Sequence, residues 1–119
     1  MKILITTEGD SLESKVDPRF GRAGNFLVYD TETEKFTTVS NTQNIQAQQG
    51  AGIQAGRTAA DTGAQAVLTG NCGPKAFRVL NQAGIRVYVG VKGTVREALD
   101  AFRKGELTEA TSANVEGHW

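Results

Sequence analysis

The sequence of 119 residues has almost none of the residues that cross-link a chain or hold a structural metal. Cys72 is its single cysteine and His118 its single histidine. One thiol excludes an internal disulfide framework and fits a reducing compartment. A structural zinc centre is also excluded, because it needs several cysteine or histidine ligands. We therefore predict a cytoplasmic protein that folds without disulfides or a structural metal.

Long apolar runs and an excess of charge are missing as well. The apolar run within residues 1–7 is too short for a signal peptide or a membrane span. Thirteen basic residues balance thirteen acidic ones, whereas a dedicated nucleic-acid-binding protein usually carries a basic footprint. Apolar residues make up 39% of the chain, as is typical of a globular protein. We predict one domain over residues 1–107 and a polar tail over residues 108–119, with neither nucleic acid nor membrane as a partner.

The first part of the chain is predicted to form three strands. Residues 2–7 are a short run with β-branched positions, and residues 25–30 and 35–40 are further runs of strand-forming residues. The polar turn between the last two runs favours an antiparallel hairpin. The long loop before the second strand contains proline and glycine, and we expect at most a brief strand in it, near Val16.

The rest of the chain alternates helices with strands. Helices are predicted over residues 50–62, 74–83 and 94–104, and strands over residues 66–69 and 86–89. Thr94 and Glu97 have the spacing of a capping box, which gives the last helix a clear start. The expected fold class is α/β: an antiparallel three-strand meander, then helix–strand–helix–strand–helix. The later strands should join in parallel through right-handed crossovers, which gives a five-stranded mixed sheet with helices on its faces.

Two similar turns follow the predicted strands of the second half. Residues 70–73 and 90–93 each have the pattern Gly-x-x-Gly between a strand and a helix. Such turns bring the N–H groups of a helix start to the carboxyl end of a strand, where anions and ligands of open α/β sheets tend to bind. The alternative is that these glycines only allow tight strand-to-helix turns. Both interpretations stay open.

The loop over residues 17–23 contains a second candidate anion site. Arg19 and Arg22 could clamp an anion with two guanidinium groups, and Phe20 could cover an apolar face of it. Long loops in compact domains are often functional. The alternative is a solvated loop that Phe20 pins into the core.

Cys72 is a candidate ligand for a soft metal. It lies at a predicted helix start, where the helix dipole favours a thiolate, and a thiolate could bind copper(I), iron or sulfur-bridged molybdenum. A buried cysteine with no metal is the alternative. His118 could also swing onto a cluster, but as the penultimate residue it could equally belong to a frayed end.

Common catalytic and nucleotide-binding patterns are absent or out of context. Residues 50–55 match G-x-G-x-x-A, but an amide-rich segment precedes them where a dinucleotide site needs a strand. No G-x-x-x-x-G-K-[ST] motif occurs. Nucleophilic catalysis has little support, because no cysteine–histidine pair stands at a recognisable spacing.

The segments 17–23, 50–53, 68–74 and 90–95, in this order, make the chain resemble the dinitrogenase iron–molybdenum cofactor biosynthesis family. This family contains NifX-like and NifB C-terminal-like domains, and the chain looks close to its small molybdenum–copper "orange protein" branch. The resemblance implies a ribonuclease-H-like fold without nuclease activity. It also implies a non-catalytic carrier that binds a molybdenum-containing metal–sulfur cluster noncovalently: iron–molybdenum cofactor, a precursor, or a molybdenum–copper sulfide. Cofactor-assembly proteins are the partners that it suggests.

A cluster of this kind carries negative charge, and its sulfides accept hydrogen bonds from N–H groups and arginine. We expect a groove between the loop 10–22, the loop 46–52 and the turn 70–73. The predicted cofactor-binding residues are Arg19, Phe20, Arg22, Gly50, Gly52, Gly70, Asn71, Cys72 and Gly73, with Cys72 as the candidate metal ligand.

Two other functions remain open at this stage. One is a regulatory or scaffold domain that binds a protein partner and has no cofactor of its own. The other is an enzyme of phosphate or nucleic-acid chemistry, which would need a divalent metal and an acid such as Asp10 or Asp30.

Overall fold

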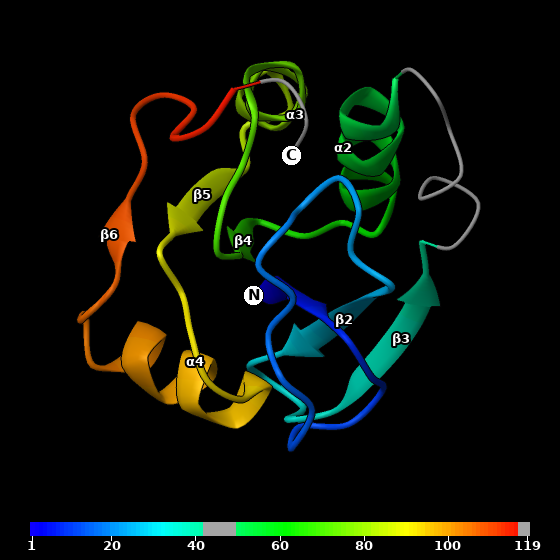
Figure 1. Cartoon of the computed structure of the whole chain (residues 1–119). Helices are drawn as coiled ribbons and strands as arrows, with labels where there is room; N and C mark the ends of the chain where they lie inside the picture. The colour runs from blue at the N-terminus through cyan, green and yellow to red at the C-terminus, as the bar shows by residue number, and fades with distance from the viewer. Residues whose placement is uncertain (42–49, 117–119) are drawn as a thin grey trace.

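The computed structural model describes residues 1–41 and 50–116, and the helices and strands follow the predicted order (Figure 1). They are β1 (Lys2–Thr7), β2 (Asn25–Asp30), β3 (Phe36–Ser40), α2 (Ala51–Asp61), β4 (Ala66–Leu68), α3 (Pro74–Gln82), β5 (Arg86–Val89), α4 (Val95–Arg103) and β6 (Thr108–Glu109). Most of the predicted boundaries are within a residue or two of these. The α/β class is therefore confirmed.

The strands form one mixed sheet in the order β3-β2-β1-β4-β5-β6. The predicted hairpin is confirmed, because β2 pairs antiparallel with both β1 and β3. β4 pairs in parallel with β1 and with β5, also as predicted. The central strand β1 thus joins an antiparallel half to a parallel half. The ribonuclease-H-like name for this arrangement stays a prediction.

The prediction of five strands is wrong, because β6 adds a sixth at the edge of the sheet. β6 pairs antiparallel with β5 and lies within the segment predicted as a polar tail. Its two residues are exposed, so no apolar alternation marks the strand in the sequence. Main-chain hydrogen bonds hold it, among them the bond from the Ala110 N–H to the Val87 carbonyl at 2.7 Å.

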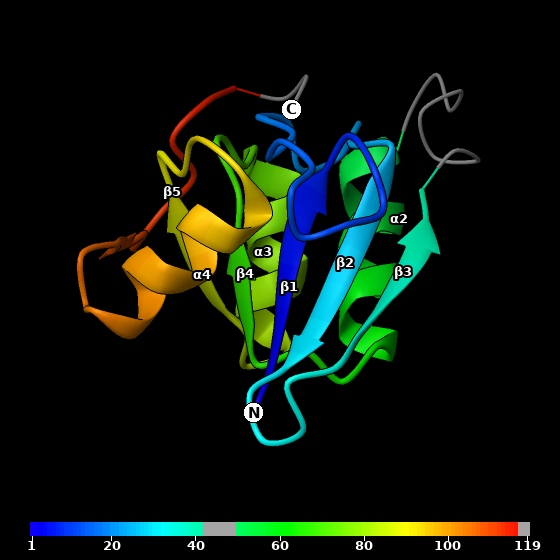
Figure 2. The ribbon, with the colours of Figure 1, turned by 90° about the horizontal axis from the view of Figure 1, so that it is seen from below.

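Helices cover both faces of the sheet. α2 and α3 lie together on one face and α4 lies on the other (Figures 1 and 2). Successive residues of β1 alternate between the two layers: Leu4 packs in the core beneath α2 and α3, while Ile3 and Ile5 pack beneath α4. Burial on both faces explains why this strand is a continuous apolar run in the sequence.

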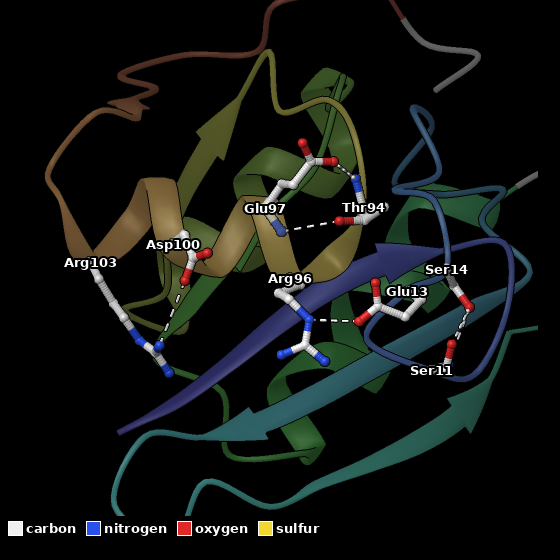
Figure 3. A network of polar contacts seen from close by, with 8 residues as sticks. All are labelled: Ser11, Glu13, Ser14, Thr94, Arg96, Glu97, Asp100 and Arg103. Atoms are coloured by element: carbon white, nitrogen blue, oxygen red, sulfur yellow. Dashed lines mark hydrogen bonds and ion pairs between the residues drawn. The ribbon is translucent and has the colours of Figure 1, made fainter.

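The three helices begin in different ways. α4 has the predicted capping box: the Glu97 N–H donates to Thr94 Oγ1 at 3.1 Å, and the Thr94 N–H donates to Glu97 Oε1 at 2.9 Å (Figure 3). The N-caps of α2 and α3 are Gly50 and Gly73, which have no side chain that could cap the helix. Nor does either helix have an acidic residue in its first turn.

Candidate anion-binding site

The loop between β1 and β2 has two halves that serve different parts of the structure. Its first half is fixed to the start of α4, where the Val95 N–H donates to the Ser14 carbonyl at 2.9 Å. Arg96 Nε also donates to Glu13 Oε1 at 2.6 Å (Figure 3). The second half, residues 17–22, reaches the face that α2 and α3 cover, where Phe20 packs in the core.

This second half is bound to β1 and to the turn after β4. Thr6 Oγ1 donates to the Asp17 carbonyl at 2.7 Å, and the Asp17 N–H donates to the Thr6 carbonyl at 2.9 Å. The Phe20 N–H donates to the Asn71 carbonyl at 3.1 Å, and a parallel bridge links Arg19 with Asn71. The structure thus places side by side two of the three segments that were predicted to form one groove, the loop 10–22 and the turn 70–73.

Gly70 is needed at this junction because the backbones are in close contact. A Cβ atom at position 70 would lie only 2.7 Å from Pro18 Cα. The Gly90 N–H donates to the Gly70 carbonyl at 2.8 Å, so the two Gly-x-x-Gly turns are neighbours. For Gly70, close packing against the loop is therefore a sufficient reason for glycine, and this reason differs from both interpretations that the sequence left open.

The starts of α2 and α3 lie side by side. A Cβ atom at Gly52 would be 3.4 Å from the Ala76 nitrogen, and one at Gly56, a turn later, would be 2.9 Å from Val79 Cβ. The two helices therefore run in the same direction and begin at the same end of the molecule, beside the carboxyl end of β1 (Figure 2). Gly50 starts α2 with a left-handed backbone, φ 77°.

Two adjacent helix starts concentrate positive electrostatic potential. The first N–H groups of a helix have no partner within it, and the macrodipole adds partial positive charge there. In α4, Glu97 compensates this charge, but the first turns of α2 and α3 contain no acid. Lys75, in the first turn of α3, is exposed and adds a full positive charge. This combination favours an anion.

The predicted arginine and aromatic residues have different positions. Arg19 is exposed and next to Asn71, while Arg22 is half-buried. Phe20 is 0% exposed and stacks on Phe26 with ring centroids 5.4 Å apart. In this structure Phe20 therefore anchors the loop in the core, which is the alternative that the sequence left open for it.

Cys72 lies in the same core. Its side chain is 0% exposed, and burial raises the pKa of the thiol to about 12. Desolvation thus favours the neutral thiol over the thiolate that metals bind. Ligation by Cys72 stays a prediction, and it would need a change in this part of the core.

Asn114 is a residue that the sequence prediction missed. Its side-chain Oδ1 accepts a hydrogen bond from the Cys72 N–H at 2.8 Å, and its backbone N–H donates to the Cys72 carbonyl at 3.2 Å. Its Nδ2 donates to Asn71 Oδ1 at 3.1 Å. No motif marks this asparagine, which lies in the segment predicted as a polar tail.

Other features of the described residues bear on the site. No group of three or more His, Cys, Asp or Glu side chains that could hold a metal ion occurs among residues 1–41 and 50–116. A cavity of about 320 Å³ lies at the opposite end of the sheet, lined by residues that include Lys2, Asp30 and Phe36. Within the described part of the chain, none of the helices has the length and hydrophobicity that a transmembrane helix requires. Residues 46–49 of the predicted groove lie outside the described residues.

The chain was compared with known families and structures. Residues 1–105 match the family described as dinitrogenase iron–molybdenum cofactor. The chain belongs to this family. The match confirms the resemblance predicted from the sequence, and it extends from β1 to the end of α4.

Two solved structures and one protein sequence are similar to this chain over almost its full length. The apo form of the orange protein from Desulfovibrio gigas is similar with a TM-score of 0.94 and 42% identity, over 96% of both chains. The NMR structure of a Thermotoga protein assigned as NifB is similar with a TM-score of 0.85 and 38% identity, over 98% of both chains. An uncharacterised protein of Methanocaldococcus jannaschii is 28% identical over 109 residues, which cover 90% of this chain and 89% of that protein.

Proposed function

We propose that this protein binds and carries an anionic, molybdenum-containing metal–sulfur cluster, noncovalently and without catalysing a reaction. The observation that supports this most strongly is the pair of adjacent helix starts, α2 and α3, which lack side-chain caps and acidic residues. Membership in the iron–molybdenum cofactor family supports the class of ligand. The similarity to the orange protein supports the small, single-domain form of the carrier.

The proposed site suits sulfide ligands for a physical reason. Bridging and terminal sulfides spread negative charge over a large, polarisable surface and accept weak hydrogen bonds. The first-turn N–H groups of both helices, except that of Pro74, which has none, would supply hydrogen-bond donors. The Arg19 guanidinium and the Lys75 ammonium would add positive charge, and none of these groups would form a bond to the metal. Binding of this kind is reversible, as a carrier requires.

A carrier must also receive its cluster and deliver it. Cofactor-assembly proteins are therefore the partners that we propose. The cluster itself can be iron–molybdenum cofactor, a precursor of it, or a molybdenum–copper sulfide, since all three are anionic and expose sulfide.

Anaerobic reconstitution tests the proposal. The purified protein would be mixed with tetrathiomolybdate, with and without copper(I), and desalted, and molybdenum, copper and sulfide per chain would be measured. We expect stoichiometric retention. Arg19→Ala should weaken binding about 10-fold, the effect of losing one charge-assisted hydrogen bond.

Arg86→Ala is the matched control, because Arg86 is exposed at the amino end of β5, at the opposite end of the parallel strands. It should bind as the wild type does. No retention by the wild-type protein, of thiomolybdate or of iron–molybdenum cofactor offered next, would contradict the proposal. That result would favour a scaffold domain that binds a protein partner instead.

A further inference from the structure

Asn114 occupies hydrogen-bonding groups that a ligand at the proposed site would need. The Cys72 N–H lies one residue before the N-cap of α3, and the side-chain oxygen of Asn114 accepts it at 2.8 Å. The amide of the same side chain donates to Asn71 Oδ1 at 3.1 Å, which uses the acceptor of the neighbouring predicted site residue. The carboxamide oxygen of Asn114 thus stands where an acceptor atom of an anion would stand.

Within the described residues, the segment that carries Asn114 is held to the sheet at its N-terminal end. The Ala110 N–H donates to the Val87 carbonyl at 2.7 Å, next to β6. From Thr111 to Glu116 the chain forms neither helix nor strand, and its residues are exposed or half-buried. Asn114 makes the hydrogen bonds between this segment and the turn 70–73 that the structure records. Its contact can therefore open without disturbing the sheet.

The strength of this contact is of the order that an anion can overcome. The hydrogen bond of Asn114 with the Cys72 N–H is partly buried and the one with Asn71 is exposed, and both join neutral groups, whose hydrogen bonds contribute little net free energy. The advantage of a sulfide is its negative charge rather than the strength of its hydrogen bond. An anionic sulfide beside the starts of α2 and α3 would also interact with both dipoles, which the neutral Asn114 side chain does far less. The exchange of Asn114 for a sulfide at the Cys72 N–H is thus favourable.

We propose that Asn114 is a latch, which closes the turn 70–73 in the empty protein and is displaced when the cluster binds. This inference rests on the proposed carrier function and adds a regulatory contact to the same site. The latch protects the helix start from other anions while the site is empty. Binding of the cluster releases the segment 111–116, and this release distinguishes the loaded from the empty carrier for a partner protein.

Two substitutions at Asn114 test the latch. Asn114→Ala removes the competing acceptor and should tighten binding of the thiomolybdate–copper cluster about 5-fold, while speeding hydrogen exchange of the Cys72 amide in the empty protein. Asn114→Asp places a competing negative charge at the helix start, so it should weaken binding. Asn81→Ala, at an exposed asparagine near the end of α3, is the control and should change neither property.

The outcomes separate the latch from the carrier function. Wild-type binding together with unchanged or weaker binding by Asn114→Ala would overturn the latch and leave the carrier function intact. Binding by Asn114→Ala alone would support a latch that is closed too firmly under the conditions used. Retention by neither protein would refute the carrier function and the latch with it. In the wild type, loading should also shift the Asn114 side-chain NMR signals toward those of a free asparagine, and unchanged signals would overturn the latch.

Discussion

The thiol of Cys72 is a buried acid, and its burial makes the stability of the protein depend on pH. Burial raises its pKa from the ordinary 9.0 to about 12. Between these values the folded chain keeps the proton while the unfolded chain loses it, so this group's contribution to stability falls as pH rises, by about 1.4 kcal/mol per pH unit. Urea denaturation from pH 8 to 11 should show wild type losing stability relative to Cys72→Ala. If the stabilities of wild type and Cys72→Ala changed with pH in the same way, the thiol would ionise as readily in the folded as in the unfolded chain.

Gly70 gives a second prediction at the scale of one residue. Gly70→Ala would place a Cβ atom 2.7 Å from the Pro18 Cα, a backbone atom that cannot move away without shifting the loop. We expect the free energy of unfolding to fall by about 2 kcal/mol in urea denaturation. Gly24→Ala is the control, because its nearest neighbour would be 3.9 Å away. Equal effects of the two substitutions would show that the close approach at Gly70 has no energetic weight.

At the scale of elements, a charge change at the paired helix starts should affect stability and cluster binding in opposite directions. Lys75→Glu puts an acid into the first turn of α3, which has none. It should raise the free energy of unfolding by about 0.3–1 kcal/mol through the helix dipole, yet weaken cluster binding by about 10-fold or more, because it repels an anion. Thermal unfolding and cluster retention would measure the two effects.

Lys104→Glu makes the same change of charge at the end of α4, on the other face of the sheet. It should lower stability slightly, since a negative charge is unfavourable at a helix C-terminus, and leave binding unchanged. If Lys75→Glu and Lys104→Glu affected binding equally, net charge rather than the helix starts would account for it.

The elements that were predicted from the sequence are those with local signals. Residues 86–89 are a short run of strand-forming residues that ends at Gly90, and Thr94 with Glu97 marks the start of α4; both predictions are confirmed. β6 was missed because two exposed residues held by main-chain bonds leave no pattern. The contact of α2 with α3 through Gly52 and Gly56 also could not be predicted, because it depends on how two separate helices pack.

The candidate site was predictable to a similar extent. The prediction of one groove put the loop around Arg19 beside the turn around Asn71, and the structure shows that these two segments are hydrogen-bonded neighbours. It could not show that Phe20 and Cys72 are fully buried, since their burial depends on the packing of the whole layer. Nor could it place Asn114, a tail residue whose partners are 42 and 43 positions away in the sequence.

At the scale of the whole molecule, the two ends of the parallel strands have different character. The carboxyl ends of β1 and β4 meet the two helix starts, the exposed Arg19 and the Asn114 contact. The opposite end has the cavity between the β2–β3 hairpin and the end of α2, and none of the predicted cofactor-binding residues lines it. If the cluster binds at the helix starts, its binding should therefore change the protein at that end of the parallel strands and not at the cavity end.

Mapping the cluster by NMR tests this account most directly. Tetrathiomolybdate with copper(I) is diamagnetic, so ¹H–¹⁵N spectra of the protein can be recorded anaerobically before and after loading. We predict that amide shifts concentrate in residues 17–22, 51–55, 70–77 and 111–116, while residues 31–37 at the cavity end stay unchanged. Shifts centred on residues 31–37, or none at either end, would contradict binding at the starts of α2 and α3.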